Sequence, residues 1–225
     1  MKYGIVFIIL LLFGACSHKE KKILAPDALK SIPKTSQVGN PIYIRIFKNE
    51  KILELWIKAK ERYTLYKRYP ILKTSGLLGP KREEGDKQNP EGFYVIDYGR
   101  LNPNSRYHLA LNIGYPNRRE RNIGYTGSNI MIHGEMKSIG CFAMGNPAIE
   151  EIYALAKYAI EGGQAYIHVA IFPFIMNNAN LSLYHDTPWY PFWRNLKEGY
   201  DFFEREKVPA EVTVIKGRYL FKPAL

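Results

Sequence analysis

Cysteine is nearly absent from this 225-residue chain, which contains only Cys16 and Cys141. A scaffold of several disulfides, as found in small secreted domains, is therefore excluded. A structural zinc site needs about four ligands, and the chain has no cluster of cysteine and histidine with metal-ligand spacing. We expect neither a metal ion nor another cofactor.

The chain also lacks the motifs of nucleotide and nucleic-acid binding. It has no Gly-rich phosphate loop, no internal repeat and no low-complexity tract. Its composition is that of a globular protein, with 46% hydrophobic and 24% charged residues, and 32 Lys and Arg against 21 Asp and Glu. The net charge of +11 favours an anionic partner such as lipid head groups, wall polymers or carboxylate-rich peptides, and we expect no nucleic-acid partner.

The first sixteen residues indicate the compartment. Lys2 precedes an apolar run over residues 5–13, which is too short to span a bilayer but suits the hydrophobic region of a secretory signal. Cys16 follows Gly14 and Ala15, a pattern that resembles the lipobox of bacterial lipoproteins, whose cysteine becomes the lipidated first residue. The alternative is a cleaved signal with an incidental cysteine. We expect an exported protein of the bacterial periplasm or cell envelope, anchored to the membrane surface through Cys16.

Export makes Cys141 informative, because Cys16 belongs either to a removed signal or to a lipid anchor. An unpaired thiol in an oxidising compartment is a liability unless it is used, which favours a chemical role over that of a small core residue. His133 ends a short apolar run at residues 130–132. Cys141 follows in a small-residue turn, residues 138–141, that can expose a thiol and direct backbone N–H groups to one point.

A thiol and an imidazole on the two sides of a turn suit nucleophilic acyl transfer. The thiolate attacks, a neighbouring imidazolium lowers the pKa of the thiol, and the imidazole can protonate a leaving amine. Metal binding is the rival interpretation, but two ligands are too few. His168 lies within a strand pattern and is interpreted as a packing residue. The other histidines, His18, His108 and His185, lie in unrelated segments without a nearby partner.

Alternating or β-rich runs predict a mainly β protein with some helix. The predicted strands are a hairpin over residues 42–56, then 63–71, 92–96, 106–113 and 165–174, and a second hairpin over 212–221. Residues 76–89 are predicted to form a long surface loop. A basic loop with Arg118, Arg119 and Arg121 could hold a substrate carboxylate or could simply be solvated.

Two helices are predicted. The first is capped by Asn146, has Pro147 in its first position and Glu150 and Glu151 in its first turn, and ends at Gly162. The second covers an aromatic-rich segment after Pro191, whose side chains are expected to pack against the sheet. The predicted fold is a curved sandwich of mixed strands with the first helix packed against it.

The residues around Cys141 resemble those of a known family. His133-Gly134 followed by Ser138-x-Gly140-Cys141 is similar to the signature of the L,D-transpeptidase catalytic domain (YkuD-type) family, whose cysteine enzymes act on peptidoglycan stem peptides. Residues 89–93, Asn-Pro-Glu-Gly-Phe, resemble the family's T-P-x-G-x-F element with Asn in place of Thr. The likeness covers residues 41–173 and is closest to the YafK-type branch of murein L,D-transpeptidase-like proteins, which shares the short spacing from His133 to Cys141 and the aromatic C-terminal extension.

This resemblance implies a role for each site residue. Cys141 would be the nucleophile, His133 the base and acid, and the carbonyl of Gly134 the group that holds the imidazole tautomer. The backbone N–H groups of Gly140 and Cys141 would form the oxyanion site. We assign Ser138 and Arg121 to binding of the stem-peptide substrate.

The predicted organisation is a signal peptide with lipobox (1–16), a tether (17–40), an L,D-transpeptidase-like catalytic domain (41–174) and a C-terminal extension packed on it (175–225). The predicted function is cysteine-dependent acyl transfer on peptidoglycan stem peptides in cell-wall remodelling, through a Cys141 thioester. The alternatives are an L,D-carboxypeptidase, an amidase that releases wall-linked lipoprotein, and a wall-binding lipoprotein without activity.

Overall fold

The computed structural model describes residues 37–223. The predicted signal peptide, its Cys16 and most of the predicted tether lie outside these residues. Within the described part of the chain, no helix has the length and apolar character needed to cross a membrane.

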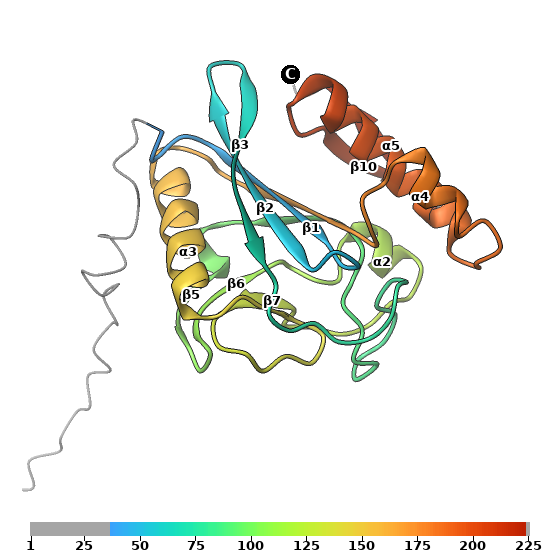
Figure 1. The fold of residues 1–225 in the computed structure, drawn as a ribbon, viewed down its shortest axis with the longest axis horizontal. Helices are drawn as coiled ribbons and strands as arrows, with labels where there is room; N and C mark the ends of the chain where they lie inside the picture. Colours follow the sequence, from blue (N-terminus) through green and yellow to red (C-terminus); the bar gives the residue numbers. More distant parts are fainter. Residues whose placement is uncertain (1–36, 224–225) are drawn as a thin grey trace, which may run out of the picture.

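A five-stranded mixed sheet forms the centre of the molecule (Figure 1). Its strands, in spatial order, are β3 (Arg62–Pro70), β2 (Ile52–Ala59), β1 (Ile42–Phe47), β9 (Ile167–Phe172) and β4 (Gly92–Ile96). β1 pairs antiparallel with β2 and parallel with β9, and β9 pairs antiparallel with β4. The predicted N-terminal hairpin and the predicted strand at 165–174 are confirmed.

β1 shows why this sheet separates two hydrophobic cores. Successive side chains of a strand point to opposite faces of the sheet. Ile42, Ile44 and Ile46 belong to one core, and Tyr43 and Phe47 belong to the other. Every residue of β1 is buried, because both faces of the sheet are covered.

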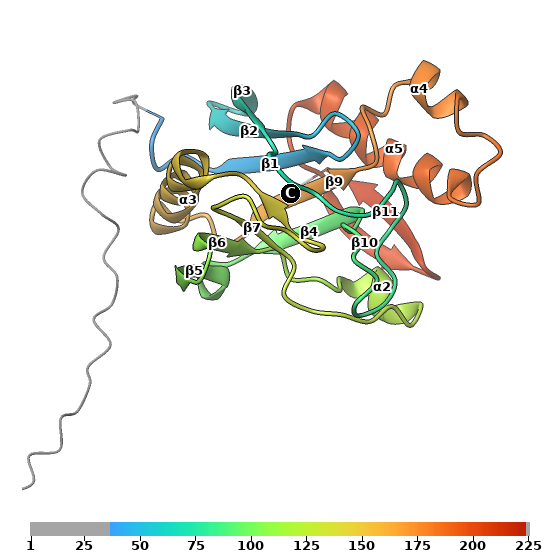
Figure 2. The same ribbon diagram turned by 60° about the horizontal axis from the view of Figure 1, so that its bottom comes forward.

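A second sheet and one helix cover the first face (Figure 2). This four-stranded sheet consists of β5 (Leu101–Ser105), β6 (His108–Asn112), β7 (Met131–His133) and β8 (Phe142–Ala143). The helix α3 (Asn146–Glu161) contributes Ile149, Ile152 and Ala156 to the same core. Two sheets with a helix against them confirm the predicted mixed α+β sandwich.

The C-terminal segment covers the other face of the five-stranded sheet (Figure 1). It comprises α4 (Asn178–Ser182), α5 (Tyr190–Glu206), β10 (Glu211–Ile215) and β11 (Arg218–Lys222). Trp193, Leu196 and Phe203 of α5 are buried in the second core. The predicted packing of these aromatics against the sheet and the predicted terminal hairpin are confirmed.

The start of α3 differs from the prediction. Gly145, with φ of 77°, occupies the N-cap position, and Asn146 is the first helical residue. The Asn146 side chain accepts the Glu135 N–H at 2.8 Å instead of capping its own helix. The first turn contains no acidic residue, so Glu150 and Glu151 serve elsewhere: Glu150 contacts His108 and Glu151 contacts Lys67.

The predicted basic loop is also wrong in part, because its residues form the helix α2 (Arg118–Asn122). A capping box explains this helix: the Asn117 side chain accepts from the Glu120 N–H, and the Glu120 carboxylate accepts from the Asn117 N–H. Three further elements were not predicted from the sequence: β5, α4 and the short 3-10 helix η1 (Tyr98–Arg100). β5 contains Pro103 and two asparagines, which are poor strand formers.

Candidate active site

Cys141 and His133 line one cleft of about 1010 Å³. The pairing of β7 with β8 brings them there, because the strands run parallel with His133 opposite Ala143. Cys141 directly precedes β8, and its Sγ lies against the Met131 N–H of β7. Both side chains therefore reach the cleft from the same pair of strands.

His133 is held in one tautomer. Its Nδ1 lies 2.6 Å from the carbonyl oxygen of Gly134, and a carbonyl can only accept, so Nδ1 carries the hydrogen. Nε2 is therefore the acceptor, and it is buried without a hydrogen-bond partner among the described residues. The Tyr107 ring stacks on the imidazole with 4.7 Å between ring centroids. The base is fixed in place with its reactive nitrogen unused.

The close packing around Gly134 explains its identity. A Cβ at this position would lie 2.7 Å from Asn146 Oδ1 and 2.8 Å from the Tyr107 carbonyl oxygen. Both distances are shorter than the contacts that Cβ atoms make in proteins. Any larger residue would displace the carbonyl that orients His133.

The Cys141 thiol is half-buried and free. Its Sγ accepts the Met131 N–H at 3.4 Å and donates to the Asn129 carbonyl at 3.5 Å. Burial raises the pKa of Cys141, while the Met131 N–H and the charge of Lys81 act in the opposite direction. Burial also lowers the pKa of His133, despite opposing effects of the Gly134 carbonyl and Glu135. Both effects of burial favour the neutral thiol and the neutral imidazole over the ion pair.

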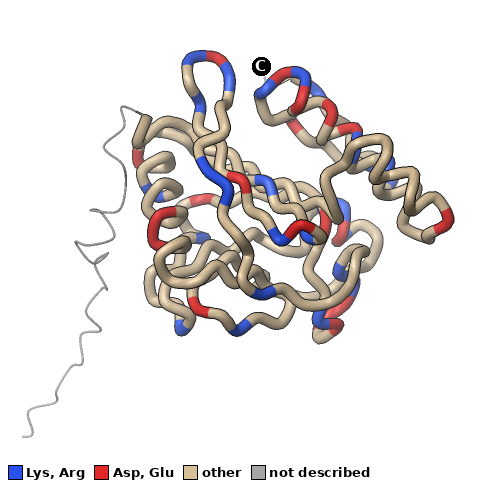
Figure 3. Tube along the Cα trace, viewed as in Figure 1, with Lys and Arg blue, Asp and Glu red and all other residues tan. Residues whose placement is uncertain are grey.

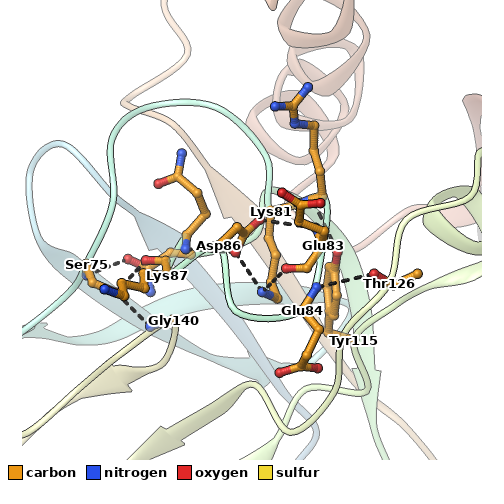
Figure 4. Close-up of polar contacts among 12 residues, drawn as sticks. Ser75, Lys81, Glu83, Glu84, Asp86, Lys87, Tyr115, Thr126 and Gly140 are labelled. Atoms are coloured by element: carbon orange, nitrogen blue, oxygen red, sulfur yellow. Dashed lines mark hydrogen bonds and ion pairs between the residues drawn. The ribbon is translucent and has the colours of Figure 1, made fainter.

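The turn that carries Cys141 is tied down from two sides. Ser138 Oγ donates to the Cys141 carbonyl at 2.6 Å, and Asn89 Nδ2 donates to the same oxygen at 2.8 Å. Asn89 Oδ1 in turn accepts the Ser75 N–H at 3.0 Å. Ser75 Oγ accepts the Gly140 N–H at 2.6 Å (Figure 4). These contacts connect the Cys141 turn to the segment 75–89.

The segment 75–89 folds around the buried Lys81 side chain, which is 4% exposed (Figure 4). Lys81 Nζ donates to Asp86 Oδ1 and to the Glu83 carbonyl, each at 2.7 Å. The Tyr115 hydroxyl donates to the Lys81 carbonyl at 3.1 Å. This predicted surface loop is thus an ordered wall of the cleft, and it brings a fixed positive charge near Cys141.

Basic residues dominate the charged lining of the cleft. Across the whole fold, acidic and basic residues are interleaved (Figure 3). In the cleft the basic residues are Lys73, Lys81, Lys87, Arg106 and Lys137, and the acidic one is Glu84. This balance favours an anionic ligand.

Residues 41–167 match the L,D-transpeptidase catalytic domain family (YkuD). The chain belongs to this family. It is 45% identical over 192 residues to "Putative L,D-transpeptidase YafK" of Escherichia coli strain K12, covering 85% of this chain and 78% of the relative. The protein of the same name from Escherichia coli O157:H7 gives the same values. The predicted family is therefore confirmed, and membership supports a cell-wall enzyme.

Two solved structures are similar at lower identity. The K307A mutant of the helical cell shape determining protein Pgp2 from Campylobacter jejuni is 20% identical, with a TM-score of 0.49, over 77% of this chain and 71% of that chain. Bd1075 of Bdellovibrio bacteriovorus is 19% identical, with a TM-score of 0.41, over 81% of this chain and 77% of that chain.

The structure places most of the predicted site residues of this L,D-transpeptidase family member together. His133, Ser138, Gly140 and Cys141 line the cleft, and Gly134 holds His133 from behind. Arg121 is exposed, contacts the Pro116 carbonyl and is not among the lining residues, so the structure gives it no place in this cleft.

The Gly140 N–H donates to Ser75, so a role in an oxyanion site requires the substrate oxygen to replace the Ser75 hydroxyl. His108 and His185 do have partners, in Glu150 at 2.6 Å and Asp186 at 3.0 Å, contrary to expectation. His168 lies in β9 and does not line the cleft.

Sequence reasoning missed four residues that shape the site: Ser75, Lys81, Asn89 and Tyr107. Asn89 lies in the element that resembles T-P-x-G-x-F, which was a signal for its position but not for its bond to Cys141. The other three act through contacts between distant segments, for which a single sequence carries no signal. Among residues 37–223, no group of three or more His, Cys, Asp or Glu is arranged to hold a metal ion.

Proposed function

We propose that this protein is a cysteine-dependent acyltransferase that acts on peptidoglycan stem peptides, with Cys141 as its nucleophile. The observation that carries the proposal is the free Cys141 thiol in one cleft with His133, whose Nε2 is the acceptor and has no partner among the described residues. Family membership supplies the substrate class.

In the first half-reaction, the proton of Cys141 Sγ passes to His133 Nε2 as the sulfur attacks an L-centred carbonyl carbon of the stem peptide. The Gly134 carbonyl stabilises the imidazolium that forms, because Nδ1–H already points at it. The bond from carbonyl carbon to nitrogen then breaks, and His133 returns the proton to the leaving amine. The products are a Cys141 thioester and a free amine.

The tetrahedral intermediate carries a negative oxygen that needs N–H donors. The N–H of Cys141 is one candidate, and the N–H of Gly140 is another once Ser75 Oγ is displaced. We propose that this exchange makes the second donor available only when substrate is bound. Ser138 and Asn89 fix the Cys141 carbonyl and thereby orient the turn.

The second half-reaction decides the product. An amine of another stem peptide would attack the thioester and give a cross-link, with His133 accepting its proton and returning it to the thiolate. Water would use the same groups and give a carboxypeptidase, or an amidase that releases wall-linked lipoprotein. We propose transfer, because the chain belongs to the L,D-transpeptidase family. Hydrolysis is the second candidate, because the short segment between His133 and Cys141 leaves little chain to shape a pocket for an acceptor amine.

The basic lining of the cleft supports the substrate class, because stem peptides carry several carboxylates. Lys73, Lys87, Arg106 and Lys137 are placed to attract such groups into the cleft. We further propose that the protein is exported and that Cys16 anchors it to the membrane. Replacing Cys16 with Ala and following the protein between membrane and soluble periplasmic fractions tests the anchor.

Product analysis tests the proposed activity. Purified protein is incubated with disaccharide tetrapeptide and, separately, with lipoprotein-linked murein, and the products are identified by mass. A dimer supports transfer, a tripeptide supports carboxypeptidase activity, and released lipoprotein supports amidase activity. Unchanged substrate in both reactions, with Cys141 reduced and murein still bound by the Cys141→Ala variant, would support a wall-binding protein without activity instead.

A further inference from the structure

A second pocket lies between α2, the start of α5 and the turn that joins β10 to β11. Its volume is about 340 Å³. Its walls include Tyr125, Trp189 and Phe192, with Arg119 and Arg218 as the basic residues. The C-terminal segment and the family domain each supply part of the pocket, and none of its lining residues lines the Cys141 cleft.

Arg119 is the unusual group in this pocket. Its guanidinium stacks on the Phe192 ring at 4.1 Å, and its Nε donates to the Gly217 carbonyl at 2.8 Å. Its Nη1 is buried and has no hydrogen-bond partner among the described residues. A buried donor without a partner costs free energy. Arg119 also lines the pocket, so its guanidinium charge would stabilise an anion bound there. Arg218 differs, because its exposed side chain is paired with Glu198.

The chemistry of the pocket indicates the ligand. A guanidinium binds a carboxylate by a charge-assisted hydrogen bond, and aromatic walls exclude water from that pair and contact the apolar part of the ligand. Phe192 also holds the guanidinium plane, so less side-chain entropy is lost when the anion binds.

The pocket and the Cys141 cleft lie on two sides of the same segments. Pro80 lines the pocket while the next residue, Lys81, lines the cleft. Tyr125 lines the pocket, and Ser128 lines the cleft. The two sites therefore share parts of their walls, and a ligand that extends past these segments would contact both. Binding energy gained at a distance from the reacting carbonyl can be used to position that carbonyl.

We propose that this second pocket is a subsite for a carboxylate of the peptidoglycan substrate, bound by Arg119 at a distance from Cys141. The identity of the substrate rests on the proposed function. The subsite itself is a binding property that can be measured without turnover.

The test is an NMR titration of the full chain carrying Cys141→Ala. The reporter is the indole N–H of Trp189, assigned with a Trp189→Phe variant. The probes are a disaccharide tripeptide and the same compound with its carboxylates converted to amides. We expect a saturable shift of the Trp189 signal with the native probe and no comparable shift with the amidated one. Equal shifts with both probes, or no shift with either, would overturn the proposal.

Arginine variants localise the effect. Arg119→Gln should weaken the affinity reported by Trp189 about tenfold, which corresponds to losing one charge-assisted pair. Arg118→Gln is the matched control, because Arg118 is an exposed residue of the same helix and does not line the pocket. Equal affinities of the two variants would contradict the assignment. If Arg119→Gln does not fold, the comparison of native and amidated probes decides alone.

Failure of the subsite and failure of the proposed function are distinguishable. If wild-type Cys141 forms a thioester but the Trp189 signal does not shift, the proposed subsite is wrong and the proposed function stands. If the Trp189 signal shifts but no thioester forms, the subsite stands and the proposed function is wrong.

Discussion

At the scale of single residues, the surroundings of Cys141 and His133 favour the neutral form of each side chain. Burial raises the pKa of the Cys141 thiol and lowers the pKa of the His133 imidazole, which disfavours a resting thiolate–imidazolium pair. The Gly134 carbonyl then has a clear purpose, because it leaves Nε2 free to accept the thiol proton during attack. The charge of Lys81 opposes the effect of burial on the thiol.

We predict that Lys81→Met raises the pKa of Cys141 further. At a fixed pH below that pKa, the thiolate fraction falls, so alkylation by iodoacetamide should slow by about threefold to tenfold, since one pKa unit changes the thiolate fraction tenfold. The measurement is the pH dependence of the alkylation rate. Lys137→Met is the control, because Lys137 lines the cleft but is exposed. Equal rates for the two variants would show that Lys81 has no special influence.

At the scale of elements, the segment before β4 is held by a buried ion pair. Lys48 Nζ lies 2.9 Å from Glu91 Oε1 and also donates to the carbonyls of Gly79 and Asn89. Glu91 Oε2 accepts from Trp193 Nε1 at 2.7 Å. One cluster therefore joins the end of β1, the cleft wall and α5.

We predict that Lys48→Met lowers the free energy of unfolding by about 3–5 kcal/mol, because it leaves the Glu91 carboxylate buried and unpaired. Urea unfolding measures the change. Lys157→Met is the control, because Lys157 pairs at 3.0 Å with Glu161, whose side chain is 44% exposed. This variant should lower the free energy of unfolding by less than about 0.5 kcal/mol. Similar losses in the two variants would argue against the buried pair as a structural support.

A buried carboxyl group in helix α2, that of Glu120, should make the stability of the fold depend on pH. Burial raises the pKa of Glu120 from 4.5 to about 7, although bonds from Tyr94 and Asn117 partly oppose this. Between these pH values the folded state binds more protons than the unfolded chain. The free energy of unfolding should therefore fall as pH rises through this window, by about 3 kcal/mol from this group. Glu120→Gln should remove that contribution in urea unfolding at several pH values.

The matched control for Glu120 is Glu211→Gln, because Glu211 is exposed in β10. This variant should keep the pH dependence of the wild-type protein. If Glu120→Gln also keeps it, the buried carboxyl does not titrate as described.

Some elements of the fold were predictable from the sequence and others were not. The strands β1, β2 and β4 were predictable, because β-rich patterns and turn residues are local signals. The beginning of α3 was not, because both Gly145 and Asn146 are acceptable caps and the contact of Asn146 with Glu135 is a tertiary one. The same holds at the site: Cys141 and His133 are visible as residue types, whereas the links from Ser75 and Asn89 to the Cys141 turn depend on a wall brought from elsewhere in the chain.

At the scale of the whole molecule, the C-terminal segment completes the second core. Tyr43, Phe47 and Phe172 of the central sheet pack against Trp193, Phe203 and their neighbours. The buried Arg45 crosses this boundary, pairing with Glu54 of β2 and Glu204 of α5, each at 2.6 Å. The segment is therefore part of the structural unit that presents the cleft.

We predict that a chain ending at residue 174 does not fold into a soluble monomer. Its truncation would expose the aromatic face of the five-stranded sheet, and large exposed apolar patches promote aggregation. Size-exclusion chromatography and thermal unfolding measure the outcome. A monomeric truncated protein with a cooperative unfolding transition would show that residues 41–174 fold alone.

The central claim is that Cys141 forms a covalent thioester with a stem peptide, with His133 as its base. The most direct measurement is the intact mass of the folded, reduced protein after mixing with disaccharide tetrapeptide. The account predicts an adduct that maps to Cys141, is released by hydroxylamine, is absent from Cys141→Ala and forms about 10²–10⁴-fold more slowly in His133→Ala. An unmodified wild-type protein, or an adduct that persists in Cys141→Ala, would contradict it.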